Sequence, residues 1–201
     1  MLKKALLHFK KNDPLLYSAA LKMSFSRELN SSKKDLYFVE LCEIIVGQQL
    51  SSKAADSIFS RFEKLFSKNI TPEKVLKMPH QKLRSAGLSN SKAKYLKNIA
   101  LAVRDGTLRL IKVDKMTDDE VKRQLIQIKG VGPWTTEMFL MFTLGRTDVF
   151  SHGDLGLRKG IKKIYGFKKD PSIKTVEKII KKWSPYKTYA SLILWKSLEI
   201  E

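Results

Sequence analysis

A glycine-rich segment at residues 127–136 has the composition of a tight turn that faces an anion. Gly130 and Gly132 flank Val131, and glycine permits a positive φ and a close approach of the backbone to a ligand. Pro133 suits the first position of a following helix, where no backbone N–H is needed. Amides of the turn and of that helix N-terminus would then face one anionic oxygen. The segment predicts a backbone clamp on a phosphate, with an ordinary turn between two helices as the alternative.

The second residue with chemistry is Asp154, which follows Ser151, His152 and Gly153 and precedes a stretch of helical pattern. An aspartate in that place is usually an N-cap, and capping alone would explain it. The N-terminus of a helix also favours the ionised form of a carboxylate. The sequence around Asp154 therefore predicts a capping side chain that is held in its charged state.

The charge of the chain indicates a partner of opposite sign. It carries 39 lysines and arginines against 20 aspartates and glutamates, a formal net charge of +19. A folded domain this basic usually binds a polyanion, most often nucleic acid, and a solvated surface in a lysine-rich proteome is the alternative. With 201 residues, 43% of them apolar, the chain can bury a core as one domain or as two small lobes.

Cys42 is the single cysteine, and it lies in an apolar run. One thiol can build neither an intramolecular disulfide, nor a four-cysteine zinc site, nor an iron–sulfur cluster, so Cys42 is expected to be buried and structural. No apolar stretch approaches the roughly 18 residues that span a membrane, and the N-terminus lacks a signal-peptide cleavage site. These features predict a cytoplasmic protein without a membrane partner.

Apolar residues recur at helical spacing through most of the chain, and the alternation of strands is hardly visible. Helix boundaries are marked as well, for example by Thr71 and Pro72 at a start and by Gly87 at an end. We therefore expect an all-α protein. The predicted helices are 1–11, 35–46, 52–67, one from 71, one from 79 to 87, 91–104, 117–126, 133–144, 154–165, 172–183 and 186–198.

Four segments carry a resemblance to a known family. They are residues 45–55 (IVGQQLSSKAA), 128–135 (IKGVGPWT), 148–160 (DVFSHGDLGLRKG) and 183–190 with Trp195. In order and spacing they resemble the helix-hairpin-helix DNA glycosylase superfamily, and more narrowly the short form of its 3-methyladenine DNA glycosylase II branch. The resemblance extends over about residues 13–198 of the chain.

This resemblance implies a two-lobed helical fold with a cleft between the lobes. One lobe would comprise residues 35–145, with the helix-hairpin-helix motif at about 118–144, and the other would comprise 1–34 plus 146–201. The implied activity is excision of alkylated bases, 3-methyladenine and related methylpurines, from double-stranded DNA in base excision repair. The enzyme would flip the damaged base out of the duplex, act as a monomer and leave an abasic site.

The resemblance makes Asp154 the catalytic carboxylate. Its charge would stabilise the oxocarbenium character of the sugar as the base departs, and it could orient or deprotonate the attacking water. Relatives that also cleave the DNA backbone carry a lysine amine where Trp134 stands, and an indole has no nucleophilic amine. We therefore expect a monofunctional enzyme without lyase activity.

A flipped base needs a pocket, and the gap that it leaves needs a wedge. The family pattern implies Gln49 as the wedge, with Leu50 as the second candidate. Trp134 and Trp195 are expected in the base pocket, with Phe38 and Tyr37 as further candidates. An indole face would attract a cationic alkylated purine by about 0.5–2 kcal/mol. The family often has aromatic residues where Met138, also assigned to the pocket, and Leu155 stand, which leaves the lesion range open.

Five other aromatic residues at helical spacing are interpreted as core: Phe59, Phe62, Phe66, Phe139 and Phe142.

The remaining expectations concern contacts with DNA and cofactors. His152 and Lys159 are candidate DNA-contacting residues beside Asp154. A monovalent cation, Na⁺ or K⁺, could be held at the hairpin by the carbonyls of Ile126, Ile128 and Val131, and no other cofactor is expected. The hairpin residues expected at a phosphate are Lys129, Gly130, Val131, Gly132 and Thr135.

Three alternatives stay open: a non-catalytic helix-hairpin-helix module, a glycosylase for oxidised or deaminated bases, and a basic helical scaffold. The role of Asp154 separates the enzyme from the module.

Overall fold

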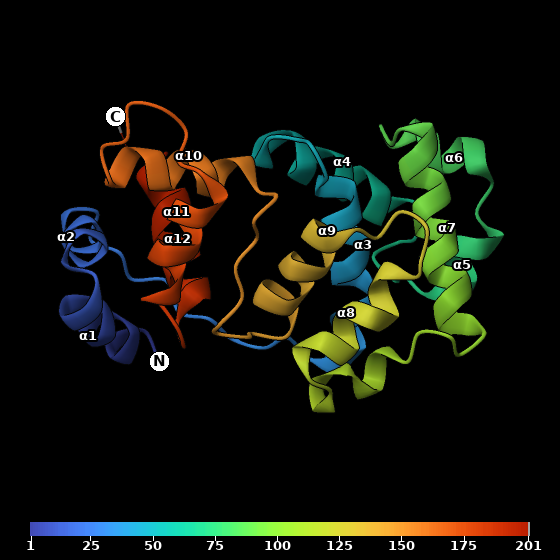
Figure 1. The fold of residues 1–201 in the computed structure, drawn as a ribbon. Helices are drawn as coiled ribbons and strands as arrows, with labels where there is room; N and C mark the ends of the chain where they lie inside the picture. The colour runs from blue at the N-terminus through green and yellow to red at the C-terminus, as the bar shows by residue number, and fades with distance from the viewer. Residues whose placement is uncertain (201) are drawn as a thin grey trace. The chain divides into compact units, whose positions relative to one another are not determined.

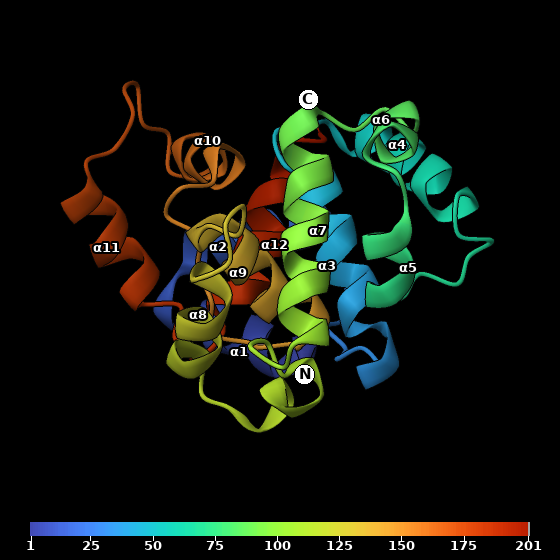
Figure 2. The same cartoon turned by 90° about the vertical axis from the view of Figure 1, so that its right-hand side faces the viewer.

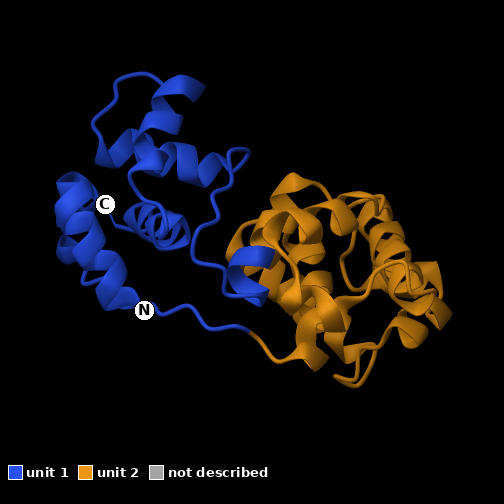
Figure 3. Ribbon diagram, turned by 60° about the horizontal axis from the view of Figure 1, so that its bottom comes forward, with its two compact units in different colours: residues 1–31, 140–201 blue, residues 32–139 orange. Residues whose placement is uncertain are grey.

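The computed structural model describes residues 1–200, and these residues are helical without a β-strand. They form two compact units (Figure 3). Unit 1 combines residues 1–31 with those from 140 onward, and unit 2 comprises residues 32–139. The expectation of an all-α protein is confirmed.

Unit 2 is organised around the helix α7, Asn90–Arg104, which packs against three others (Figure 2). Its buried face is formed by small and branched apolar residues at helical spacing, such as Ala93, Leu96 and Ile99. The other elements of unit 2 are η1 (Lys34–Leu36), α3 (Tyr37–Gly47), α4 (Ser52–Lys64), α5 (Pro72–Lys77), α6 (His80–Ser85), η2 (Leu110–Lys115), α8 (Asp118–Ile126) and α9 (Pro133–Met138). The packing partners of α7 are α3, α5 and α6.

The predicted start signals of two helices in unit 2 are confirmed by their hydrogen bonds. Thr71 caps α5 by accepting a hydrogen bond from the amide of Lys74, and Pro72 takes the first helical position. At α8, Thr117 and Glu120 form a reciprocal capping box. Local polar residues therefore fix where these helices begin.

Unit 1 is built around the last helix, α12 (Lys187–Ser197), which is buried on almost all sides. It packs against α10 (Leu155–Ile164) and α2 (Pro14–Lys22), as Figure 1 shows for α10. Because α12 is enclosed all round, it has no amphipathic stripe to display. The remaining elements of unit 1 are α1 (Leu2–Asn12) and α11 (Ile173–Lys181).

Three features of the helices differ from the sequence-based expectation, and the first is the short 3₁₀ helix η2, which was not expected. The helix α2 was not expected, although Asp13 caps it and Pro14 opens it. The expected helix 133–144 is α9 followed by a π-helical turn, η3, over Phe139–Thr143. A single π-helical turn hardly changes the spacing of apolar residues along a helix, so the sequence pattern does not distinguish it from an α-helix.

A buried carboxylate, Asp13, joins three helices of unit 1. It is 3% exposed and accepts hydrogen bonds from the Leu16 amide at 3.2 Å and from Nε1 of Trp183 at 2.9 Å. The hydroxyl of Tyr165 donates a third, and burial together with Asp13 raises the pKa of Tyr165. These donors belong to the beginning of α2 and to the residues that follow α10 and α11.

Replacing Asp13 with alanine is expected to lower the free energy of unfolding by about 3 kcal/mol or more, because it leaves three donors buried without their acceptor. Urea unfolding followed by circular dichroism measures the change. Asp170→Ala, which removes an exposed carboxylate paired with Lys162 at 3.0 Å, is the control and should leave the free energy of unfolding nearly unchanged. Equal losses in the two variants would contradict the prediction.

Candidate functional site

The glycine-rich segment of unit 2 forms a tight hairpin between α8 and α9. The Val131 amide donates to the Ile128 carbonyl at 2.9 Å, and both side chains are buried. Gly132 is the N-cap of α9, and its carbonyl accepts hydrogen bonds from the amide and hydroxyl of Thr136, each at 3.1 Å. Val131 therefore packs inward, as the sequence predicts, while Pro133 begins the helix.

Gly130 has a backbone conformation and surroundings that only glycine fits. Its φ is +106°, and a Cβ atom there would lie 2.1 Å from Cγ of Tyr95 on α7. The next carbonyl upstream, that of Lys129, accepts a hydrogen bond from Nδ2 of Asn98 at 2.9 Å, while the Lys129 side chain is exposed. The hairpin thus packs against α7, and the ammonium group of Lys129 is exposed to solvent.

The loop between α3 and α4 exposes the two predicted wedge residues. Gln49 has a φ of +56°, unusual for a residue with a side chain, and Leu50 is 39% exposed. The preceding residue, Gln48, points back into unit 2: its Nε2 donates to the Gly130 carbonyl at 3.1 Å and to Oγ1 of Thr135 at 2.8 Å. We call residues 48–51 the wedge loop. Its first side chain ties it to the hairpin.

Thr135 is one of the residues predicted to contact a phosphate, but its side chain is buried and does not face solvent. It is 1% exposed, and its hydroxyl accepts the hydrogen bond from Gln48. The part of Thr135 suited to an anion is its backbone amide in the first turn of α9. A phosphate contact through that amide stays a prediction.

Lys92 is a site residue that the sequence analysis did not identify. Its Nζ atom donates to the carbonyls of Val46, at 2.9 Å, and Gln48, at 2.7 Å, and burial lowers the pKa of its ammonium group. It lies on α7, remote in sequence from the loop that it contacts. Among so many lysines, no local signal distinguishes it.

In unit 1, Asp154 is both the N-cap of α10 and the partner of an indole. Its Oδ1 accepts a hydrogen bond from the Leu157 amide at 2.8 Å and another from Nε1 of Trp195 at 3.1 Å. The predicted capping role is confirmed. Gly156 leaves room for this contact, since a Cβ there would lie 3.0 Å from both Asp154 Oδ1 and Trp195 Nε1.

Trp195, the indole partner of Asp154 in unit 1, also belongs to a pair of aromatic rings. The ring of Phe142 lies 5.8 Å from that of Trp195, tilted by 34°, and the guanidinium of Arg27 lies 5.4 Å above the Phe142 ring. Trp195 and Arg27 also line a cavity of about 450 Å³. Phe142 is half-buried and packs against the hydrophobic core of unit 1, in agreement with its assignment to the core. Phe59, Phe62, Phe66 and Phe139 are buried as expected.

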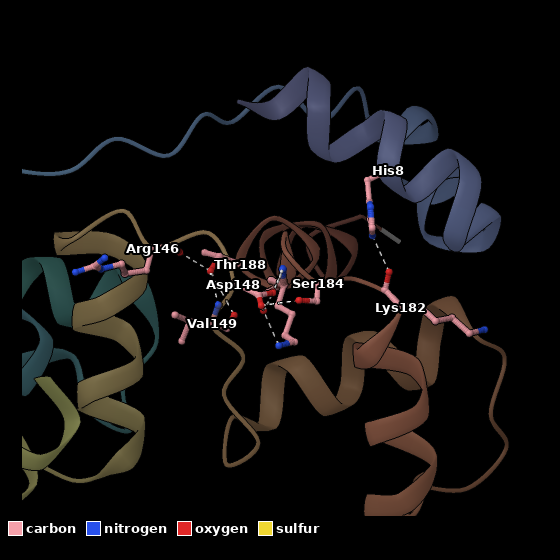
Figure 4. A network of polar contacts seen from close by, with 9 residues as sticks. His8, Arg146, Asp148, Val149, Lys182, Ser184 and Thr188 are labelled. Carbon is pink, nitrogen blue, oxygen red and sulfur yellow. Dashed lines mark hydrogen bonds and ion pairs between the residues drawn. The ribbon is translucent and has the colours of Figure 1, made fainter. Parts of the chain in front are cut away.

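The segment leading to Asp154 is held on the beginning of α12 by a polar network (Figure 4). The Thr188 hydroxyl donates to the Arg146 carbonyl at 2.6 Å and accepts from the Val149 amide at 3.1 Å. Asp148 accepts hydrogen bonds from Oγ of Ser184 at 2.7 Å and from Nζ of Lys187 at 3.2 Å. The sequence analysis assigned no role to these residues.

The other predicted site residues lie in different surroundings. Phe38 and Met138 are buried in unit 2, while Trp134 is half-buried in the first turn of α9. In unit 1, Leu155 is 69% exposed beside Asp154 and Lys159 is exposed on α10. Their roles in a base pocket or at DNA stay predictions.

His152, the other candidate for a DNA contact, has a protein partner. Its Nε2 lies 3.3 Å from Oε1 of Glu177, and its ring meets that of Phe150 edge-on at 5.1 Å. Both His152 and Glu177 are exposed, so this pair leaves the histidine accessible. Of the helices in residues 1–200, none is long and apolar enough to cross a membrane.

The hairpin, the wedge loop and the capped carboxylate lie within one family match. Residues 42–185 match the model of the HhH-GPD superfamily base excision DNA repair proteins, and the chain belongs to this superfamily.

Individual relatives are similar over most of the chain. A putative DNA-3-methyladenine glycosylase, YfjP, of Bacillus subtilis is 34% identical over 79% of this chain, which spans 58% of that protein. The DNA-3-methyladenine glycosylase 1 of Schizosaccharomyces pombe is 34% identical over 87% of this chain and 78% of its own length.

Solved structures agree with this. The S. pombe 3-methyladenine DNA glycosylase Mag1 in complex with abasic DNA matches with a TM-score of 0.89 and 32% identity, covering 98% of this chain and 97% of that one. A DNA-3-methyladenine glycosidase from Bacillus halodurans matches with a TM-score of 0.77 and 36% identity, covering 94% of this chain and 86% of that one.

Proposed function

We propose that the protein is a monofunctional DNA glycosylase that removes alkylated bases, such as 3-methyladenine, from double-stranded DNA and leaves an abasic site. The observation that carries the proposal is the carboxylate of Asp154, held at a helix N-terminus with the indole of Trp195 bound to it. The similarity to the S. pombe enzyme, which was solved with abasic DNA, supports it.

In the proposed mechanism, unit 2 holds and distorts the DNA. The hairpin amides and the first turn of α9 would bind a backbone phosphate, which positions the strand without reading its sequence. Gln49 and Leu50, exposed on the wedge loop, would occupy the gap that the flipped nucleotide leaves in the stack. These contacts would hold the damaged nucleotide outside the base stack.

Asp154 would then act on the sugar. The glycosidic bond breaks, its electron pair leaves with the base, and the sugar gains positive charge that a carboxylate stabilises. The Leu157 amide and the Trp195 indole hold the carboxylate of Asp154 in place through Oδ1. We assign to this carboxylate the role of orienting or deprotonating the water that attacks the sugar.

The same residues support hydrolysis without strand cleavage. A lyase step needs an amine that forms a Schiff base with the sugar, and the hairpin carries Trp134 at the corresponding place. A covalent adduct between the protein and DNA after borohydride treatment would contradict this part of the proposal.

We propose that a monovalent cation, Na⁺ or K⁺, binds to backbone carbonyls of the hairpin. The proposed ligands are the carbonyls of Ile126, Ile128 and Val131. That of Ile128 already accepts a hydrogen bond from the Val131 amide at 2.9 Å, and a carbonyl oxygen has a second lone pair that can serve an ion. A bound Na⁺ or K⁺ would add a positive charge where a phosphate approaches. The side chains of the hairpin would contribute little to holding it.

We propose further that the enzyme acts as a monomer and in the cytoplasm, where the single cysteine would stay reduced. Its partner would be duplex DNA with a damaged base, which suits a chain with a net charge of +19.

The proposed function is tested by incubating the purified protein with methylated DNA and identifying the released bases by chromatography. Release of 3-methyladenine, together with abasic sites that break only on alkaline treatment, is the expected result. If no base is released while the protein still binds abasic DNA, the alternative of a non-catalytic binding module is favoured.

Arg27 leads to a prediction about which lesions are excised. Its guanidinium already lies over the face of Phe142, so a cationic methylpurine that stacks nearby would meet a like charge. Arg27→Met is therefore expected to raise the excision of cationic 7-methylguanine relative to neutral hypoxanthine by about threefold to tenfold. Single-turnover rates on two matched oligonucleotides measure the ratio, with Lys22→Met as the control, because it removes an exposed charge from α2. An unchanged ratio would show that Arg27 does not select lesions.

A further inference from the structure

The wedge loop has a backbone conformation that its own sequence does not favour. Gln49 occupies positive φ, although it is not glycine, and the loop leaves Leu50 partly in solvent. Two backbone hydrogen bonds join this turn to the end of α3, from the Gln48 amide to the Ile45 carbonyl at 3.4 Å and from the Leu50 amide to the Gly47 carbonyl at 3.2 Å. Side chains from elsewhere in unit 2 add further contacts to it.

Lys92 supplies the first of these contacts. The helix α3 ends at Gly47, and the carbonyls near a helix C-terminus lack partners within the helix and carry partial negative charge. The ammonium of Lys92 donates to two carbonyls there, those of Val46 and Gln48, at 2.9 and 2.7 Å. One side chain of α7 thus fixes both the end of α3 and the first residue of the wedge loop.

Gln48 supplies the second contact. Its backbone carbonyl is an acceptor of Lys92, and its side-chain amide donates to the Gly130 carbonyl and to the Thr135 hydroxyl. These two acceptors lie on either side of the glycine–proline turn of the hairpin. Gln48 therefore connects the wedge loop to both arms of the phosphate-binding hairpin, and α7 supports the same residue from the other side.

We propose that Lys92 and Gln48 form a clamp that joins the wedge loop and the hairpin into one rigid DNA-distorting element. This inference rests on the proposed function, and it makes both residues positioning residues, since neither would touch the reacting atoms. A loop that enters the base stack must resist the restoring force of stacking. A loosened loop could instead fold Leu50 back onto the protein.

The clamp predicts a defect in base unstacking that exceeds any defect in DNA binding. Phosphate contacts at the hairpin supply affinity, whereas the geometry of the wedge loop determines whether a nucleotide leaves the stack. Lys92→Met should therefore lower the single-turnover rate of base release by about tenfold or more. Its affinity for undamaged duplex DNA should stay within about threefold of the wild type, because the hairpin is retained.

Lys94→Met is the matched control, because Lys94 lies on the same helix, is exposed, and loses the same charge. A DNA duplex with 2-aminopurine beside an abasic-site analogue reports unstacking by its fluorescence. Wild type and Lys94→Met should increase this fluorescence equally, whereas Lys92→Met should lose most of the increase. Lys92→Arg, which keeps a charged donor, should recover part of it.

Gln48→Glu tests the second half of the clamp independently. A carboxylate there would face the Gly130 carbonyl without a hydrogen to donate, so the loop should detach from the hairpin while α7 still holds the end of α3. The fluorescence increase should fall as it does in Lys92→Met. The effects of Gln48→Glu and Lys92→Met should also be less than additive when the two substitutions are combined. This variant decides the matter if Lys92→Met does not fold.

Several outcomes would overturn the proposal. It fails if either clamp variant unstacks 2-aminopurine as well as Lys94→Met does, or if unstacking falls only in proportion to DNA affinity. Because the fluorescence assay requires no base release, it is independent of the proposed chemistry. A wild-type protein that unstacks DNA through the clamp but releases no base would refute the proposed function and leave the clamp intact.

Discussion

Asp154→Asn should abolish base release and retain binding to abasic DNA. Asparagine keeps an oxygen in place of Oδ1, so it can still cap α10 and accept the hydrogen bond of Trp195. What it loses is the negative charge that would face the sugar. Since removing a single electrostatic contact to a transition state costs about 10²–10³-fold, the single-turnover rate should fall by about 100-fold to 1,000-fold.

The measurement needs two comparisons. Asp170→Asn removes another carboxylate of unit 1 that is exposed and paired with Lys162, and it should leave the rate unchanged. The affinity of Asp154→Asn for a duplex with an abasic-site analogue should be within a few-fold of the wild type, because the hairpin is untouched. A variant that keeps a tenth of the wild-type rate would show that Asp154 caps a helix and does nothing more.

Most of the fold could be predicted because its signals are local. Apolar periodicity and caps such as Thr71 and Thr117 identify helices from a few neighbouring residues. The helix α2 escaped prediction although Asp13 and Pro14 form a good start, because the apolar residues after them do not form one clear face. Asp13 is also the acceptor of Trp183, a contact between residues far apart in sequence that no local pattern indicates.

The residues of the candidate site also fall into two groups, those that local sequence indicates and those that are placed by contacts with residues remote in sequence. Gly130 and Asp154 were found because turn chemistry and capping depend on neighbours in the chain. Lys92 and Gln48 were missed because their function in the fold arises from hydrogen bonds to backbone carbonyls, which every sequence contains.

The hairpin provides the second large effect, since Gly130→Ala should disable DNA binding. Its φ of +106° is unfavourable for any residue with a Cβ atom, and that atom would lie within 2.5 Å of three atoms of Tyr95. The hairpin or α7 must move to relieve this overlap. We expect a loss of about 3 kcal/mol or more in the free energy of unfolding and a decrease of tenfold or more, on the order of 1.4 kcal/mol, in affinity for duplex DNA.

Gly132→Ala separates the two consequences of this substitution. A Cβ at Gly132 has no neighbour within 4 Å, and its φ of −100° is acceptable to alanine, so the fold should keep its stability. If a phosphate approaches the backbone here, Gly132→Ala should still weaken DNA binding, although urea unfolding is unchanged.

In Gly130→Ala, the added substitution Tyr95→Ala should restore stability in part, because it removes the overlap and leaves the unfavourable φ. If Gly130→Ala kept the full affinity for DNA, the hairpin would be an ordinary turn, and another part of the chain would have to bind the DNA phosphate.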